Sequence, residues 1–574
     1  MGDEMSDFSA QDEKDGFKLK LWRGERMCLL GLDVAQPEDD LAGFAIEVQA
    51  PDSNEFKPLP NRLNFSYDKP THEAVTGARL YSSLEAPFQR FRWIDFPAEQ
   101  QPGEYRYRVT KMHMPQDGKL VAGSQLTLGL SLDPVTYADF LDVGFTRNFA
   151  SSQAFSDRYG TKPQLIPAQA DDGLAFHKTD ADAYTWLGFE ALELIKGVLD
   201  EAVANTDLSI ELLAYDLNEP DLVARLADLG PRLRAVIDDS GSHAPAHSAE
   251  SQAAARFAAS AGAGNVRRTH FQGLQHHKVL IVKRKGTPEK VLFGSTNFSF
   301  RGLYIQANNV IVVQSPAAAA LFANVFEQAF SNPAGFANNP LALQWHLVQA
   351  APGQPSLQFC FSPHRDSGLS LNPLAAAIDQ ASSSVLYSIA FLNQIKTGPT
   401  REALDRLMDS PLFSYGVVNS DTGLIVNKPD HTQGVVDFAY LSAKAPEPFK
   451  SEWSGGAGIH IHHKFVVTDF NLPTARVFTG SSNLSPSGEE GNGDNLVMIQ
   501  DQRIATSYAI EALRMFDHLH FRTAMQQALA NNPQTAPKAL TLRKPTAISG
   551  QPAWFADFYA ADSQKAKDRQ LFSS

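Results

Sequence analysis

An internal duplication constrains the fold of this chain more than any other feature. The segment HHKVLIVK…VLFGSTNFSFRGLYIQANNVIVVQS, which starts at His276, repeats as HHKFVVTD…VFTGSSNLSPSGEEGNGDNLVMIQD, which starts at His462. An offset of 186 residues aligns the two copies over about fifty residues without a gap. A gap-free repeat of this length does not arise by chance, so the chain is predicted to contain two similarly folded units.

Each copy is predicted to be an α/β unit. Residues 184–204 carry apolar side chains at helical spacing and precede the strand-like run LSIELLAYDL. Residues 372–381 are predicted as the equivalent helix, with Asn372 as its N-cap and Pro373 at its first helical position, before the strand SVLYSIAFL. The helices that follow the repeated motifs are predicted to begin after Ser315 and Asp501. We expect the two units to pack face to face around a pseudo-twofold axis.

A third, different module precedes the duplication. Residues 17–135 contain short β-rich runs such as FKLKLW, GFAIEVQA and EYRYRVTKMHM, separated by turn sequences such as QPGE and QDGK. Their number and spacing predict an all-β sandwich of immunoglobulin or fibronectin type. This module shows no catalytic constellation, so we interpret it as an accessory module for packing or targeting.

These patterns divide the chain into five predicted parts. They are a flexible N-terminus (1–16), the β-sandwich (17–135), a first α/β half (136–345), a second α/β half (346–532) and a C-terminal extension that packs on the core (533–574).

Composition and charge restrict the function classes. The 574 residues are 43% hydrophobic and 20% charged, with a formal net charge of -14. A broad surface for duplex nucleic acid usually needs a basic face, so this charge disfavours one. No run approaches the ~20 apolar residues that span a bilayer. The acidic start MGDEMSDFSAQDEKDG is no secretory signal, and the two cysteines suit a reducing compartment, so we expect a cytoplasmic protein.

The repeated motif predicts a phosphate site. If HHKVLIV is a strand, His276 and Lys278 share one face and His277 points to the other, which selects the first histidine of each pair. A second strand then ends in a Gly-Ser-x-Asn turn, whose glycine permits close backbone approach and whose polar side chains can bind an anionic oxygen. The predicted catalytic residues are His276, Lys278, Asn297, His462, Lys464 and Asn483.

A metal site is not predicted from the histidine-rich second motif. On a strand only His460 and His462 share a face, whereas structural zinc sites usually have four ligands. We therefore expect neither a metal nor another cofactor. Because both half-sites lie in one chain, the site needs no dimer, and a monomer is the expected state.

The motifs resemble the signature of the phospholipase D superfamily, His-x-Lys-x4-Asp followed by Gly-Ser-x-Asn. The first copy departs from that signature only at Lys283, where the family usually has Asp. The resemblance covers roughly residues 160–530 and implies two pseudo-twofold-related α/β/α half-domains, a phosphohistidine intermediate and no metal requirement. Tyrosyl-DNA phosphodiesterases lack the same Asp, and position 283 has the opposite strand parity to His276, so Lys283 is expected to be tolerated. The second copy matches the signature fully at His462, Lys464, Asp469, Gly480, Ser481 and Asn483.

The resemblance also implies supporting residues. Family members carry a Glu or Gln eleven residues after the motif Asn to orient the catalytic imidazole, and this chain has Asn308 and Asp494 there. We pair Asp494 with His462, since a carboxylate would favour a protonated general acid. We pair Asn308 with His276, whose neutral ring would be the nucleophile. Asp469, Ser295 and Ser481 complete the predicted supporting set.

Three functions are compatible with these residues. The favoured one is a phospholipase D-type hydrolase that converts phospholipid to phosphatidate and a head-group alcohol, with peripheral contact at a membrane surface. The alternative is a nuclease or nucleic-acid end-processing phosphodiesterase, which the missing Asp supports. A degenerate, non-catalytic scaffold is the third, and the intact His, Lys and Asn residues in both copies argue against it. The motifs recognise a phosphodiester and do not distinguish what it carries.

Overall fold

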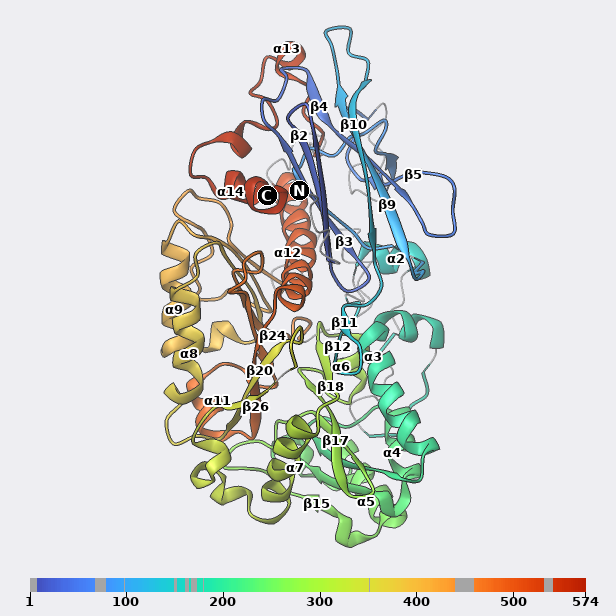
Figure 1. Ribbon diagram of the computed structural model, residues 1–574, viewed down its shortest axis with the longest axis vertical. Helices are drawn as coiled ribbons and strands as arrows, with labels where there is room; N and C mark the ends of the chain where they lie inside the picture. The colour runs from blue at the N-terminus through green and yellow to red at the C-terminus, as the bar shows by residue number, and fades with distance from the viewer. Residues whose placement is uncertain are drawn as a thin grey trace.

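Three regions make up the molecule (Figure 1). A β-rich region lies at one end, and two α/β halves lie side by side at the other. The computed structural model describes residues 8–67, 79–97, 99–148, 152–160, 165–166, 173–178, 180–349, 351–438, 459–530 and 540–574.

The front region is a sandwich of two four-stranded sheets, in the orders β1-β2-β3-β8 and β10-β9-β4-β5. All the strand pairs in the two sheets are antiparallel. Both sheets contribute to one hydrophobic cluster, which includes Phe17, Leu30, Phe44 and Tyr107. The strands are β1 (Ser9–Lys14), β2 (Phe17–Arg23), β3 (Cys28–Val34), β4 (Leu41–Gln49), β5 (Lys57–Pro58), β8 (Arg92–Asp95), β9 (Glu104–His113) and β10 (Val121–Ser131), beside a small pair of β6 (Pro60–Asn61) and β7 (Tyr81–Ser82).

The expectation of a flexible segment over residues 1–16 is wrong for its second part. Residues 9–14 form β1, which pairs with β2 in the register Lys14↔Phe17. Asp15 and Gly16 form the two-residue loop between them, with φ values of 53° and 75°. Positive φ at both positions is the mark of a type I′ hairpin turn, for which Asp-Gly is a preferred sequence. Residues 1–7 lie outside the described residues.

Each half contains an eight-stranded mixed sheet, and the two sheets have the same strand order. The orders are β11-β12-β18-β17-β16-β13-β14-β15 and β19-β20-β26-β25-β24-β21-β22-β23. The duplicated α/β architecture is therefore confirmed. The first sheet comprises β11 (Thr136–Tyr137), β12 (Leu141–Phe145), β13 (Leu208–Ala214), β14 (Leu233–Ile237), β15 (Val266–Arg268), β16 (Val279–Arg284), β17 (Thr287–Gly294) and β18 (Asn309–Val313). The second comprises β19 (His346–Val348), β20 (Ser356–Ser362), β21 (Ser384–Ile389), β22 (Phe413–Val418), β23 (Val435–Asp437), β24 (Lys464–Thr468), β25 (Arg476–Gly480) and β26 (Asp494–Gln500).

Helices cover both faces of the two sheets. One large hydrophobic cluster joins the sheets and includes Ile281 and Ile311 of the first half and Phe465 and Val497 of the second. Separate clusters lie under the outer helices of each half. The helices are α2 (Gln153–Tyr159), α3 (Ala181–Ala204), α4 (Pro220–Asp228), α5 (Ala249–Ala261), α6 (Phe300–Tyr304), α7 (Pro316–Ser331), α8 (Gly368–Asp379), α9 (Pro399–Asp409), α11 (Pro486–Gly491), α12 (Gln502–Ala530), α13 (Thr546–Ser549) and α14 (Gln564–Ser573). Short 3₁₀ turns are η1 (Gly230–Arg232), η2 (Gly241–His243), η3 (Ala263–Asn265), η4 (Pro333–Asn338), η5 (Pro340–Ala342), η6 (Leu392–Gln394) and η7 (Ala556–Tyr559).

Two predicted helix starts are confirmed. Ser315 caps α7 by accepting a hydrogen bond from the Ala318 amide, and Asp501 accepts one from the Ile504 amide at the start of α12 at 2.8 Å. Among the described helices, none has the length and apolar character needed to cross a bilayer.

The predicted start of α8 is wrong. The helix begins at Gly368, so Pro373 lies inside it rather than at its first position. A proline inside a helix leaves the carbonyl four residues earlier without its amide donor. Here that carbonyl, Leu369 O, accepts a hydrogen bond of 2.9 Å from Trp345 Nε1. A side chain distant in sequence thus satisfies the group that proline leaves unpaired.

The C-terminal helices connect the sandwich to the second half. Helix α12 packs on β22 and on β2, and α14 packs on β3. The Trp22 indole donates to Phe572 O at 2.8 Å. A Cβ at Gly31 would lie 2.0 Å from the same carbonyl oxygen, so only glycine allows this close approach.

Candidate active site

The predicted site lies where the two halves exchange backbone hydrogen bonds. His276 N donates to Gly493 O at 2.9 Å, and His462 N donates to Ala307 O at 3.1 Å. The two contacts are equivalent under the 186-residue offset: in each, the motif histidine of one half bonds to the same position of the other half. The tertiary structure therefore places both motif histidines along the interface between the halves.

The two imidazoles are oriented by the opposite halves. His276 Nδ1 lies 2.7 Å from Asp494 Oδ1, and His462 Nδ1 lies 2.8 Å from Asn308 Oδ1. Each Nδ1–H donates to a side-chain oxygen, which puts the lone pair of each neutral ring on Nε2. The predicted pairing within each half is wrong, because β18 and β26 both begin at the interface and present these side chains across it.

The motif serines hold the orienting side chains. Ser295 Oγ donates to Asn308 Oδ1 at 2.9 Å, and Ser481 Oγ donates to Asp494 Oδ1 at 2.6 Å. Each hydroxyl also accepts a backbone N–H, from Asn309 or Asn495 respectively, at 3.0 Å. The hydroxyl protons are thus directed to the orienting residues and not to the centre of the site.

The motif glycines are required by packing. A Cβ at Gly294 would lie 2.4 Å from Asn309 O, and a Cβ at Gly480 would lie 2.3 Å from Asn495 O. Their φ values are 155° and 144°, in the region that side chains rarely adopt. The turn can therefore approach the neighbouring strand only with glycine at this position.

The second histidine of each pair points away from the first, as predicted. His277 Nδ1 lies 3.2 Å from Asn495 Nδ2, and His463 Nδ1 lies 3.4 Å from Asn309 Nδ2. These contacts also cross between the halves. Regular β16 begins at Val279, directly after Lys278, and regular β24 begins at Lys464, so the motif histidines precede both strands.

Two buried lysines occupy the centre of the site. Lys464 Nζ donates to His462 O at 2.7 Å and lies 3.1 Å from His462 Nε2, while Lys278 Nζ donates to His276 O. Burial lowers the pKa of Lys278 to about 8 and holds the pKa of Lys464 well below its usual value, with the charge of Lys278 adding to the second effect. Asp494 and Asp216 oppose the lowering of both pKa values, so the two amines share one set of neighbouring carboxylates.

Both catalytic imidazoles are neutral in the free site. Burial lowers the pKa of His276, an effect that Asp494 opposes and Lys278 and Lys464 strengthen. Burial also lowers the pKa of His462 well below its usual value, and both lysines lower it further. His276 and Lys278 hold the pKa of Asp494 at about 2 although burial opposes this, so Asp494 is ionised. Each histidine thus responds to the lysines of both halves, and the two half-sites form one site.

The motif asparagines, Asn297 and Asn483, and the motif aspartate of the second copy, Asp469, have different surroundings. Asn297 Nδ2 donates to Asp216 Oδ2 at 2.7 Å, and the Oδ1 atoms of Asn297 and Asn483 are buried without a hydrogen-bond partner among the described residues. Asp469 accepts backbone N–H bonds from Ser382, Ser383 and Ser384, at 2.9, 2.7 and 3.2 Å to its nearer oxygen. Asp469 therefore holds the backbone at the start of β21 and does not orient an imidazole.

Lys283, in the place of the first family Asp, also lies outside the site. Its Nζ donates to Glu211 Oε1 of β13 at 2.6 Å. This bond is with β13 and not with the His276 half-site, which agrees with the strand parity of position 283.

Sequence comparison agrees with this geometry. The family model "Cardiolipin synthase, PLD-like domain" matches the chain twice, over residues 199–330 and 374–516. The chain belongs to the phospholipase D superfamily. As a superfamily member it acts on a phosphodiester substrate. No curated protein matches the sequence.

Three solved structures are similar to parts of this chain. Phosphatidylserine synthase from Haemophilus influenzae Rd KW20 is 13% identical, over 59% of this chain and 90% of that chain, with a TM-score of 0.40. A mutant of the yeast tyrosyl-DNA phosphodiesterase is 12% identical, over 53% and 86%, with a TM-score of 0.30. Nuc from Salmonella typhimurium is 26% identical, over 24% and 86%, with a TM-score of 0.20.

This phospholipase D superfamily site also contains aromatic residues that the motifs do not include. The Tyr215 ring packs edge-on against His276 at 4.8 Å, and the Phe391 ring packs edge-on against His462 at 6.1 Å. Lys278 lies over Tyr215, and Lys464 lies over Phe391. Tyr215 directly follows β13, and Phe391 follows the equivalent strand β21 after one residue. This position after equivalent strands is the sequence signal that could have identified both.

A charged cluster beside the first half-site was also missed. Within the described residues, Asp216, His243 and Glu250 are the one group with ligand atoms close enough for a metal, all within 4.8 Å of one another. However, His243 Nδ1 and Nε2 both bond to carboxylates, at 2.8 Å to Asp238 and 3.0 Å to Asp216. Burial opposes a charge on His243, but these bonds outweigh it and raise its pKa to about 10. A protonated imidazole has no lone pair for a metal, so the cluster fits a proton better.

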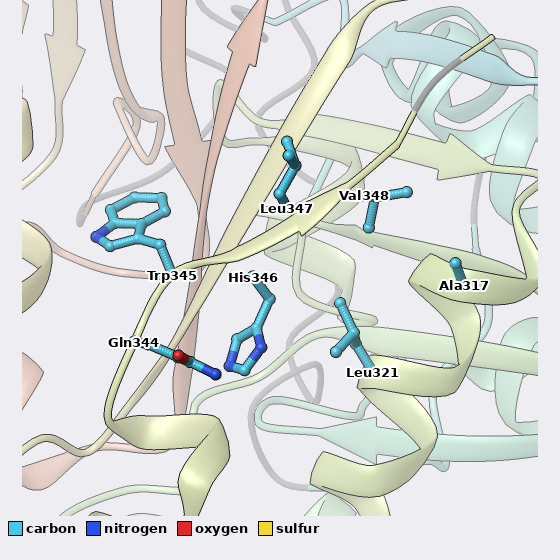
Figure 2. Close-up of a pocket in the computed structure, with 7 residues that line it drawn as sticks. All are labelled: Ala317, Leu321, Gln344, Trp345, His346, Leu347 and Val348. Carbon is cyan, nitrogen blue, oxygen red and sulfur yellow. The ribbon is translucent and has the colours of Figure 1, made fainter.

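The catalytic histidines of this superfamily member are buried. His276 and His462 are 4% and 5% exposed. A separate surface cavity of about 310 Å³ lies between α7 and β19 and is lined by Ala317, Leu321 and residues 344–348 (Figure 2). None of its lining residues belongs to the catalytic constellation.

Proposed function

We propose that this protein hydrolyses phospholipid to phosphatidate and a head-group alcohol, through a phosphohistidine on His276. The observation that carries the proposal is the crossed pairing of His276 with Asp494 and of His462 with Asn308, around Lys278 and Lys464. Two imidazoles with their lone pairs on Nε2 and two lysine amines provide a nucleophile, an acid and charge stabilisation for phosphoryl transfer.

His276 is the nucleophile in this proposal. Its Nδ1–H donates to an ionised carboxylate, whereas His462 donates to a neutral amide. The carboxylate increases the electron density at His276 Nε2 and stabilises the positive charge of the phosphorylated ring. The role is the one predicted from the sequence, but its physical reason is reversed, because the carboxylate orients the nucleophile and not the acid.

His462 acts as the acid and then as the base. A phosphodiester anion beside Lys278 and Lys464 offsets the lysine charges that lower the pKa of His462, so substrate binding favours its protonation. In the first step a bond forms between His276 Nε2 and phosphorus, the bond to the leaving oxygen breaks, and His462 Nε2–H protonates that oxygen. In the second step His462 takes a proton from water, whose oxygen bonds to phosphorus as the bond to His276 breaks.

The charges near the site support a lipid substrate over a nucleic acid. The net charge is -14, and Asp216, with its side chain 36% exposed, lies beside Asn297 with Asp238 and Glu250 behind it. Such a rim repels a polyanion more than a single phosphodiester. Lys283, which supported the nuclease alternative, lies outside the site and supports neither substrate. The family description names a synthase, so an alcohol in place of water is a second acceptor to test.

The substrate is tested with phosphatidylcholine liposomes and with single- and double-stranded DNA, all in EDTA, with and without added glycerol. We expect phosphatidate and choline from the liposomes, and a phosphatidyl alcohol where glycerol replaces water. His276→Ala should abolish either product. Cleavage of DNA without lipid turnover would overturn the lipid assignment, and wild-type turnover by His276→Ala would overturn the mechanism.

The roles of the two histidines are tested with an activated aryl phosphodiester in His462→Ala. Such a leaving group needs no acid, whereas hydrolysis of the intermediate still needs the base, so the phosphoenzyme should accumulate on His276. Asp494→Asn should slow its formation by on the order of 10²-fold, while Asn308→Asp should affect that step much less. A phosphate adduct mapped to His462 in Asp494→Asn or wild-type protein would reverse the assignment.

A further inference from the structure

His243 lies at the centre of a charged network beside the first half-site. Its Nδ1 lies 2.8 Å from Asp238 Oδ2 and its Nε2 lies 3.0 Å from Asp216 Oδ1. His243 is buried, and Ser240 bonds to the same Asp238 oxygen. The imidazole therefore has both of its ring nitrogens committed to carboxylates, which fixes its orientation.

The network reaches catalytic groups through both carboxylates. Asp216 Oδ2 accepts from Asn297 Nδ2 at 2.7 Å, so the motif amide is held by the carboxylate that His243 holds. Asp238 Oδ1 accepts from the backbone N–H of Gln275 at 2.7 Å, directly before His276. His243 does not itself contact the reacting atoms. It is hydrogen-bonded to Asp216 and Asp238, and these two carboxylates bond Asn297 and the backbone beside His276.

An aromatic contact gives a third connection. The Tyr215 ring packs edge-on against His243 at 4.6 Å and against His276 at 4.8 Å. Displacement of His243 would therefore open space behind the ring that supports the nucleophile.

The described residues of the second half have no equivalent network. Asn419 takes the place of Asp238, since its Oδ1 accepts the backbone N–H bonds of His460 and Ile461 at 3.0 and 3.3 Å. Leu392, buried, follows Phe391 as Asp216 follows Tyr215. The half-site with the proposed nucleophile is therefore the one with the charged support.

We propose that His243 is a positioning residue for phosphoryl transfer, which bridges Asp216 and Asp238 and so holds the Asn297 amide against the transferred phosphoryl group. The inference rests on the proposed function. Without the imidazolium, Asp216, Asp238 and Glu250 repel one another, and Asp216 turns away and carries the Asn297 amide with it. The raised pKa of His243, about 10, agrees with a permanently charged bridge at neutral pH.

The first test compares His243→Ala and His243→Gln with wild type on a soluble aryl phosphodiester. We expect kcat to fall by roughly 10²-fold in His243→Ala, as for a misplaced catalytic group, with KM changed much less. His243→Gln keeps one donor and should recover part of that loss. His247→Ala, an exposed neighbouring histidine, is the matched control and should keep wild-type values. A loss of thermal stability with unchanged kcat would show a structural role only and would overturn the proposal.

The second test is a double-mutant cycle with Asn297→Ala. If His243 acts through Asn297, His243→Ala should change kcat by only a few-fold when Asn297 is already absent. If the two substitutions instead lowered kcat independently, so that their separate fold-losses multiplied in the double variant, the proposal would be overturned. Vanadate affinity, which needs no turnover, should fall in His243→Ala and stay unchanged in His247→Ala. If the protein turned over no phosphodiester, the proposed function would fail, and vanadate would still decide the role of His243.

Discussion

At the residue scale, one difference between two side chains makes a symmetric site asymmetric. Asn308 and Asp494 occupy equivalent positions and make equivalent bonds, but only Asp494 carries a charge. The imidazole that contacts the charge, His276, is the one best able to carry positive charge after attack on phosphorus. The duplicated geometry therefore does not imply duplicated chemistry.

Lys278 predicts the alkaline limit of activity. An amine is charged below its pKa, and burial lowers the pKa of Lys278 to about 8. Anion binding by this group is therefore complete well below pH 8 and is lost as the pH rises through that value. We expect kcat/KM to fall by about tenfold per pH unit once the amine is deprotonated, since kcat/KM reports groups of the free enzyme.

The pH–rate profile of Lys278→Arg checks this assignment. Arginine stays charged at all accessible pH values, so the alkaline fall should move upward in this variant even if its maximum rate is lower. Lys285→Arg, at the exposed tip of the β16–β17 hairpin, is the control and should keep the wild-type profile. An unchanged alkaline limb in Lys278→Arg would assign the limit to another group.

At the element scale, the ends of β17 and β25 bring the site together. Each strand ends in a glycine. Gly294 lies against the carbonyl of Asn309 in β18, and Gly480 lies against the carbonyl of Asn495 in β26. The following serine then bonds the orienting side chain at the start of that strand. Strand ends, and not loops, therefore set the positions of the imidazoles, which suits a site that needs accurate geometry.

Gly480→Ala should destabilise the protein and impair the site. Its Cβ would lie 2.3 Å from Asn495 O at a φ of 144°, so the turn must move. We expect a loss of about 1–3 kcal/mol in unfolding free energy, typical of overpacking, together with slower turnover because Ser481 moves from Asp494. Denaturant unfolding and the aryl phosphodiester assay measure the two effects.

Gly197→Ala is the matched control for this substitution. Gly197 lies inside α3, where an added Cβ meets nothing within 4 Å. Alanine should stabilise a helix interior by roughly 0.5–1 kcal/mol relative to glycine. Equal unfolding midpoints for Gly480→Ala and wild type would contradict the packing argument.

At the scale of the whole molecule, Arg92 connects three parts of the chain. It lies on β8 of the sandwich, and its guanidinium donates to Asp517 of α12 and to Asp568 of α14, both at 3.1 Å through Nη2. The side chains of Arg92 and Asp568 are buried. The sandwich is therefore joined to the C-terminal helix by a buried ion pair and to the second half by a partly buried one.

Arg92→Ala should weaken this junction strongly. Removal of one partner leaves buried carboxylate charge uncompensated, which costs about 3–5 kcal/mol in comparable buried pairs. We expect a lower unfolding temperature, measured by calorimetry, with the catalytic residues themselves unchanged. Arg406→Ala breaks an exposed pair with Asp379 and should cost no more than about 1 kcal/mol. Similar effects of the two substitutions would show that the Arg92 junction contributes little.

The sequence alone predicted the elements and the chemical groups of the site. The repeat predicted two equivalent α/β halves, and strand periodicity separated His276 from His277 and excluded Lys283 from the site. Ser315 and Asp501 could be predicted as caps because a cap bonds to an amide within the first turn of its own helix. Periodicity, repeats and caps are local properties, so they can be read along the chain.

Only the tertiary structure decided which groups meet. The partner of His276 is 218 residues away in the opposite half, and the predicted partner was wrong because no local pattern encodes a contact across a pseudo-twofold axis. The start of α8 depends on an indole from outside the helix, which satisfies Leu369 O. The charged bridge of Asp216, His243 and Asp238 forms only when three separate strand and turn ends converge at one sheet edge. Residue identity thus determined the available chemistry, and packing between distant segments determined how it is used.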